Sequence, residues 1–147
     1  MATIFWDCQG VVLIDFLPRG TTMTGQYYAA LLGRLREAVK KERRGKLSRG
    51  VLLLHDNAPP HTSHLATSAI HNCGFEVLTH PPYSPDLAPS DFHLFANLKK
   101  VLGGSRFTQE SEAKAFVTEW LTEQTHDFYL HGIRTLLKRW QKCIDVR

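Results

Sequence analysis

The 147-residue sequence lacks the features that mark several classes of protein. No apolar run approaches the roughly 18 residues of a membrane-spanning helix. The N-terminus has no basic region followed by an apolar stretch, so it predicts no secretory signal. Cysteine is scarce, and Cys8, Cys73 and Cys143 are widely spaced. Their odd number argues against a disulfide framework and favours a reducing compartment.

The composition is that of a globular protein, with 43% hydrophobic and 22% charged residues. The length suits one domain with a hydrophobic core. The net charge of +4 is a mild indication of a polyanionic partner. The basic residues concentrate in one segment, which contains Arg34, Arg36, Lys40, Lys41, Arg43, Arg44, Lys46 and Arg49. This segment is consistent with a solvated helix end and loop, or with a patch that contacts phosphates.

Hydrophobic periodicity and turn residues predict an α/β chain. Strands are predicted over 3–6, 11–17, 51–54 and 75–78, with a turn at 7–10 between the first two. Helices are predicted over 26–41, after a cap at Thr62 or Ser63, and over 110–123 and 127–144. A basic linker over 45–50 and an extended proline-rich loop over 79–90 connect some of these elements. Ser90 is the predicted N-cap of a further helix that begins at Asp91. This order predicts a mixed sheet flanked by helices.

Two aspartates occupy positions at which such a fold could bind a ligand. Asp56 follows an apolar strand, and Asp91 opens a helix after the proline-rich loop. Ligands of open α/β sheets bind at the carboxyl ends of strands, and carboxylates suit Mg²⁺ or Mn²⁺. Each residue has an ordinary alternative, because aspartates also form turns and complement helix dipoles. The spacing alone leaves both interpretations open.

A zinc site is a competing interpretation, because His55, His61, His64 and Cys73 lie close in sequence. However, the chain has no CxxC pair and no HExxH motif, and its histidine spacings match no structural zinc pattern. A serine or cysteine nucleophile is also disfavoured. There is no GxSxG motif, and Cys73 falls on an apolar helix face.

Long motifs in the chain resemble the catalytic domain of mariner-family transposases. They are "HDNAPPH" at 55–61, "YSPDLAPSDFHLF" at 83–95 and "DFYLHGIRTLLKRWQKCID" at 127–145, preceded by "FWDCQGVVLIDFLPRGTT" at 5–22. The resemblance implies a ribonuclease-H-like fold and a DDE/D-type transposase that cuts and joins DNA with Mg²⁺ or Mn²⁺. Asp56 matches the second catalytic aspartate of the family and Asp91 the third, and their separation by residues 57–90 agrees with the family's spacing.

The sequence departs from the family pattern at its beginning. The strands over 3–6 and 11–17 are predicted to form a β-hairpin. In the family the first catalytic aspartate lies upstream of this hairpin, so we expect it to be absent here, together with the first strand and the helix-turn-helix domains. Asp7 aligns with the hairpin and not with the catalytic position. We therefore expect residues 1–147 to form a single partial catalytic domain with weak or no activity alone. The alternatives are a non-catalytic DNA-binding or dimerising module and an inactive relic.

Further residues are predicted around these two aspartates. Asn57, His61 and Tyr83 are expected to support the site, and Asn57 and the prolines after it are expected to form the turn that directs the Asp56 carboxylate. Contacts to double-stranded DNA, the transposon ends of the family, are expected from Arg43, Arg44, Lys46, Lys99 and Lys100. The resemblance also implies a homodimer and a nuclear location, with no membrane partner.

Overall fold

The computed structural model describes residues 2–56, 58–78 and 84–145. Mixed α/β structure is present, as predicted, and the chain divides into two compact units. The first unit comprises residues 1–5 and 12–82, and the second comprises residues 6–11 and 83–147. Asp56 therefore belongs to the first unit and Asp91 to the second.

The strands form two separate pairs in the described part of the chain. Strands β1 (Ala2–Asp7) and β2 (Gly10–Phe16) form the predicted hairpin, and β3 (Val51–Leu53) pairs in parallel with β4 (Phe75–Val77). We expected a single mixed sheet, but no described strand hydrogen-bonds to both pairs. The parallel pairing brings the carboxyl ends of β3 and β4 to the same edge, so β3 directs the chain toward Asp56 at that edge.

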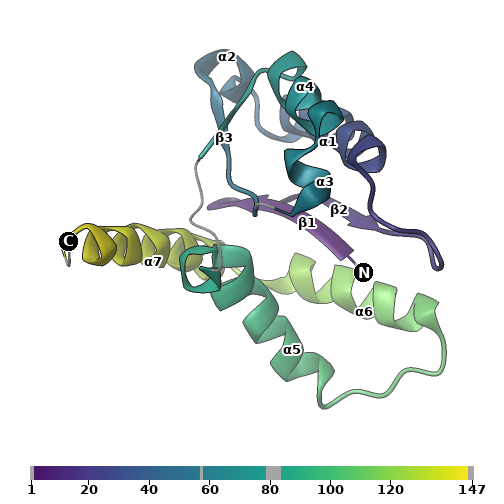
Figure 1. Cartoon of the computed structure of the whole chain (residues 1–147). Helices are drawn as coiled ribbons and strands as arrows, with labels where there is room; N and C mark the ends of the chain where they lie inside the picture. The colour runs from purple at the N-terminus through teal and green to yellow at the C-terminus, as the bar shows by residue number, and fades with distance from the viewer. Residues whose placement is uncertain (1, 57, 79–83, 146–147) are drawn as a thin grey trace. The chain divides into compact units, whose positions relative to one another are not determined.

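Helix α1 (Gly25–Glu42) organises the core of the first unit, and its bounds confirm the predicted helix over 26–41. Thr24 caps it by accepting a hydrogen bond from the Tyr27 backbone N–H at 3.0 Å. One face of α1 packs against α4 (His64–Asn72) and α3 (Pro59–Thr62) (Figure 1). The buried residues of the cluster are Tyr28, Leu31, Leu32, Leu35, Val39, Leu53, Ala66, Ile70 and Phe75. The three- and four-residue spacing within α1 places its members on one stripe.

Two short helices replace segments that the sequence predicted as linker or turn. The basic linker contains α2 (Lys46–Arg49), which begins after Gly45, a residue in the left-handed region with φ of 82°. Helix α3 begins on two prolines, Pro59 and Pro60, after its N-cap residue Ala58. Proline suits the first helical turn because its missing N–H would have no partner there and its φ is already helical. The prolines thus start a helix where we expected only a turn.

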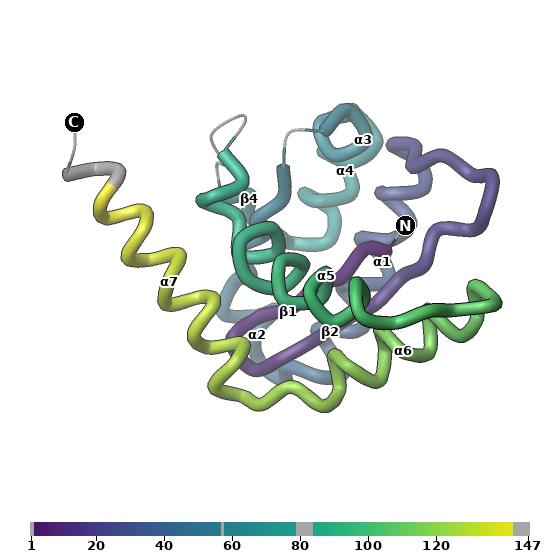
Figure 2. The backbone as a smooth tube through the Cα atoms, turned by 90° about the horizontal axis from the view of Figure 1, so that it is seen from below, coloured from purple at the N-terminus to yellow at the C-terminus, as the bar shows by residue number. Residues whose placement is uncertain are grey.

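The second unit is helical apart from the tip of the hairpin. Its elements are η1 (Pro85–Leu87), η2 (Ser90–Phe95), α5 (Ala96–Leu102), α6 (Glu110–Glu123) and α7 (His126–Asp145). The predicted helix over 110–123 is confirmed, whereas the extended loop contains a turn of 3-10 helix, η1. Figure 1 and Figure 2 both show α7 running away from α5 and α6. No helix in the described ranges is long and apolar enough to cross a membrane.

The prediction that Ser90 caps a helix was wrong. Pro89 occupies the N-cap position, and Ser90 is the first residue of η2, a turn of π-helix. The Ser90 hydroxyl instead accepts a hydrogen bond from the indole N–H of Trp6 at 2.9 Å. A partner 84 positions away in the chain has therefore replaced the local cap.

Candidate functional site

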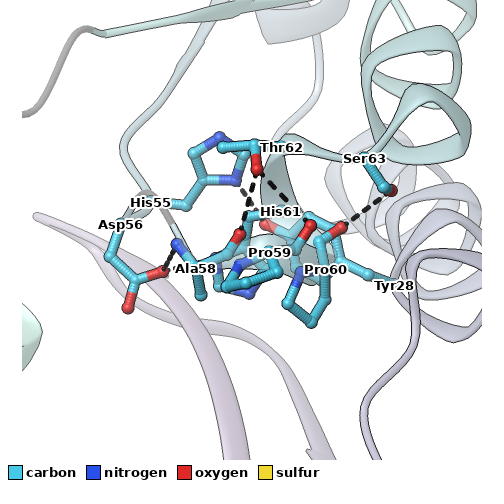
Figure 3. A network of polar contacts seen from close by, with 9 residues as sticks. All are labelled: Tyr28, His55, Asp56, Ala58, Pro59, Pro60, His61, Thr62 and Ser63. Carbon is cyan, nitrogen blue, oxygen red and sulfur yellow. Dashed lines mark hydrogen bonds and ion pairs between the residues drawn. The ribbon is translucent and has the colours of Figure 1, made fainter.

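Asp56 is held in a tight turn between β3 and α3. Its Oδ1 accepts a hydrogen bond from the Ala58 backbone N–H at 3.1 Å, which is the turn-forming role expected of an aspartate. The side chain is nevertheless 63% exposed. In Figure 3 the other carboxylate oxygen, Oδ2, points away from the residues drawn around it. One oxygen of Asp56 thus shapes the turn while the other faces outward.

Three aromatic rings from different segments gather behind Asp56. Tyr28 comes from α1, His55 precedes Asp56, and His61 comes from α3. Ring centroids lie 4.1 Å apart for Tyr28 and His61, 5.1 Å for His55 and His61, and 5.7 Å for Tyr28 and His55. The two imidazoles are stacked with an interplanar angle of 3°. The Tyr28 hydroxyl lies 2.8 Å from Nδ1 of His55. We call these three residues the ring cluster.

Burial sets the protonation of two members of the ring cluster, His55 and Tyr28. It lowers the pKa of His55 to about 4, with a further lowering by the charge of His61 and an opposing effect of the Asp56 carboxylate. Burial, and secondarily the negative charge of Asp56, raises the pKa of Tyr28. At neutral pH His55 is therefore uncharged and Tyr28 keeps its proton. The tyrosine hydroxyl donates to Nδ1 of His55, which leaves the imidazole proton on Nε2.

His61 connects the ring cluster to Asp56. Its Nδ1 lies 2.6 Å from Oδ1 of Asp56, and its side chain is only 20% exposed. The carboxylate oxygen lies off the axis of the ring N–H, so this contact is a close electrostatic pair and not an aligned hydrogen bond. Two acceptor atoms would repel each other at 2.6 Å, so the contact is attractive only when Nδ1 carries a proton.

Asp91 occupies a different local structure in the second unit. It lies in the first turn of η2, where its side chain is exposed and its charge complements the helix N-terminus. The neighbouring Ser90 is tied to Trp6, whose ring lies 6.4 Å from that of His93 and 5.8 Å from that of Tyr129. A single π-helical turn is rare and is frequently found at functional sites. The packed aromatic rings thus hold the backbone that carries Asp91.

Comparisons with known proteins agree with this layout. The family model described as transposase, partial DDE domain, matches residues 1–49. The chain is 39% identical over 146 residues to the Homo sapiens protein named histone-lysine N-methyltransferase SETMAR, and 38% identical over 146 residues to the Mariner Mos1 transposase of Drosophila mauritiana. These matches cover 99% and 98% of this chain, but only 21% and 42% of the relatives.

Solved structures give the same result. The structure of the Mos1 transposase catalytic domain with raltegravir and Mn is 37% identical, with a TM-score of 0.94, and the match covers 99% of this chain and 74% of that one. The crystal structure of the Mos1 catalytic domain also has a TM-score of 0.94, with 37% identity and coverage of 99% and 72%.

This chain belongs to the mariner family of transposases. The match places its fold with the ribonuclease-H-like catalytic domain of Mos1 over nearly the whole chain. The resemblance of its motifs is thereby confirmed, although the chain spans less than half the length of the two relatives compared.

The remaining predicted site residues of this mariner chain lie in several places. Arg43 ends α1, Arg44 follows it and is exposed, and Lys46 begins α2. Lys99 and Lys100 are exposed in the last turn of α5, in the second unit. Asn57 and Tyr83 lie outside the described residues. The basic residues thus form one group in each unit, and their contact with DNA stays a prediction.

The structure brings two of the candidate zinc ligands, His55 and His61, into the ring cluster, while His64 is exposed on α4 and Cys73 follows its last turn. Among the residues that the structure describes, no three histidine, cysteine, aspartate or glutamate side chains form a ready metal site. Sequence reasoning missed Tyr28 and Trp6, which support the two aspartates. The sequence indicated only that Tyr28 and Trp6 lie on apolar faces, and not that they lie near the aspartates.

Proposed function

We propose that this chain is part of a mariner catalytic domain that cuts and joins DNA by metal-dependent phosphoryl transfer, with Asp56 and Asp91 as metal ligands. The observation that carries the proposal is the likeness to Mos1 catalytic domains solved with Mn and with Mg, at TM-scores of 0.94 and 0.93. The match includes both motifs that contain these aspartates, since it covers 99% of the chain.

The local geometry of each aspartate is compatible with this role. Both side chains are exposed, and Oδ2 of Asp56 faces outward. Mg²⁺ and Mn²⁺ prefer carboxylate oxygens and keep positions for water or phosphate. A pair of such ions stabilises both the attacking and the leaving oxygen in phosphoryl transfer. The two aspartates would supply ligands for such a pair, and the DNA phosphate would complete it.

We further propose that residues 1–147 alone have weak or no transposase activity. The motifs of this chain match the second and third catalytic aspartates of the family. A two-ion site that lacks a shared carboxylate leaves the charge of the metal ions poorly compensated. The chain should therefore bind Mn²⁺ weakly, and nick supercoiled DNA slowly or not at all.

Titration with Mn²⁺, followed by electron paramagnetic resonance of the free ion, tests the metal site. Asp56→Asn and Asp91→Asn should each weaken Mn²⁺ binding, whereas Asp127→Asn, which removes an exposed carboxylate from the first turn of α7, should not. Equal Mn²⁺ binding by the unaltered chain and the three variants would remove the basis for the metal site.

A nicking assay on supercoiled DNA tests the claim that residues 1–147 alone have weak or no activity. Robust cleavage that Asp56→Ala or Asp91→Ala abolishes would show that the chain is active alone.

Double-stranded DNA is the proposed partner, because Mos1 has been solved as a paired-end complex with its left transposon end. The exposed cations Lys40, Lys41, Arg44 and Arg49 also favour a second candidate function, a DNA-binding module without catalysis. Filter binding over a salt series measures this directly, since each phosphate contact adds about −0.9 to the slope of log affinity against log salt. Absence of duplex binding even at low salt would refute it. Dimerisation and a nuclear location stay proposals that follow from the family.

A further inference from the structure

We propose that His61 is a positioning residue for Asp56. It holds the carboxylate by Oδ1, so that Oδ2 is presented outward to a divalent cation. This inference rests on the proposed metal site and deepens it, because it names what orients one of the two ligands. Its basis is that His61 contacts Tyr28 and His55 within the ring cluster and also contacts Asp56 (Figure 3).

The first step is that His61 itself is fixed. Its ring lies 4.1 Å from the ring of Tyr28 and is stacked on that of His55. Tyr28 is 1% exposed and belongs to the hydrophobic core of the first unit, so His61 packs against a residue of the folded core. The backbone of His61 is held as well, because its N–H donates to the carbonyl of Ala58, the N-cap of α3, at 2.9 Å.

The second step is that Asp56 needs such a restraint. An exposed aspartate on a turn can rotate about two side-chain bonds, and ordering it costs conformational entropy. The Ala58 N–H alone restrains Oδ1 from one side, at 3.1 Å. Nδ1 of His61 approaches the same oxygen at 2.6 Å from the ring cluster. Two contacts on Oδ1 define the plane of the carboxylate, and this leaves Oδ2 directed away from both.

The third step concerns the chemistry of the metal ligand. A cation that binds Oδ2 can do so without breaking either contact at Oδ1, so the carboxylate is oriented before the ion arrives. Residues that hold a metal-ligating carboxylate or imidazole in place typically contribute about 10–100-fold to metal affinity. A contact that only shaped the turn would instead stabilise the fold and leave metal affinity unchanged.

Three variants separate these roles. His61→Ala removes the ring, and His61→Asn keeps an amide donor near the position of Nδ1. His64→Ala removes an exposed histidine on the next helix and serves as the matched control. Mn²⁺ affinity at one fixed pH should fall about 10–100-fold in His61→Ala, be partly restored in His61→Asn and stay unchanged in His64→Ala. Circular dichroism and urea unfolding verify that each variant is folded.

A second measurement tests the contact between His61 and Asp56 in the absence of metal. Carbon and nitrogen NMR of the metal-free protein should place the proton of His61 on Nδ1, and the carboxyl carbon signal of Asp56 should shift in His61→Ala but not in His64→Ala. If folded His61→Ala binds Mn²⁺ within twofold of the His64→Ala control, the positioning role is overturned. If Asp56→Asn also binds Mn²⁺ as the unaltered chain does, the metal site itself fails. If His61→Ala leaves the Asp56 carboxyl signal unchanged, the contact itself is refuted, whatever the metal result.

Discussion

Acidification should destabilise the first unit through His55. The pKa of this imidazole is about 4 in the folded chain, against 6.5 for an ordinary histidine. Between these two values the unfolded chain binds more protons than the folded chain. The free energy of unfolding therefore falls as the pH is lowered from about 6.5 toward 4, and the full stabilisation is present only above that range.

The magnitude follows from the difference between the two pKa values. A fall from 6.5 to about 4 corresponds to at most about 3 kcal/mol, since one pKa unit equals 1.36 kcal/mol. Because the ring is only half-buried, solvent screening reduces this value. We therefore expect His55 to account for about 1–2 kcal/mol of lost stability between pH 7 and pH 5.

Urea unfolding followed by far-ultraviolet circular dichroism, in the presence of a chelator, measures this loss. Carboxylates also titrate in this range, so the informative quantity is the difference between the unaltered chain and His55→Asn. The amide oxygen of that variant can still accept the hydrogen bond from Tyr28, but it does not titrate. Its stability should fall less steeply with acidification. If the two proteins lose stability in parallel from pH 7 to pH 5, the reasoning about His55 is refuted.

Three further predictions concern packing at two glycines and one hydrogen bond between distant residues. A β-carbon at Gly33, inside α1, would meet no atom within 4 Å, so Gly33→Ala should stabilise the chain by up to about 1 kcal/mol. A β-carbon at Gly132 would lie 2.5 Å from the His93 ring, so Gly132→Ala should destabilise it by about 1–3 kcal/mol in the same urea assay. Equal effects of these two substitutions would contradict the close approach of Gly132 to the His93 ring. Trp6→Phe should cost about 1 kcal/mol and speed amide exchange in η2, because Ser90 loses its indole donor. If Ser90→Ala adds its full cost on top of Trp6→Phe, the hydrogen bond is not the reason.

The parts of the fold that hydrophobic periodicity governs could be predicted from the sequence. The recurrence of Tyr27, Leu31, Leu35 and Val39 predicted α1, and the structure extends it by one residue at each end. Such a helix forms because one stripe of its side chains is buried, and the residues of that stripe recur every three or four positions in the local sequence. The helix over 110–123 and the hairpin were predicted for the same reason, since their signals lie within short windows.

The parts that depend on distant contacts could not be predicted. Serine is a preferred N-cap residue, yet the Ser90 hydroxyl accepts a hydrogen bond from the indole N–H of Trp6. Similarly, the ring cluster joins Tyr28 on α1 to His61 on α3, and no periodicity of the chain indicates that meeting. The start of α3 was a different kind of failure. Prolines favour turns, but they also favour the first turn of a helix, as Pro59 and Pro60 do in α3.

The two aspartates share a mode of support that neither motif indicates by itself. Each carboxylate is exposed, while the segment that carries it is anchored to packed aromatic rings of the same unit: Asp56 through Tyr28 and His61, and Asp91 through Trp6. A catalytic group must be accessible and also held in a defined geometry, and rigid neighbours resolve this conflict. The segment that carries each aspartate is therefore held in place within its own unit, without a metal ion.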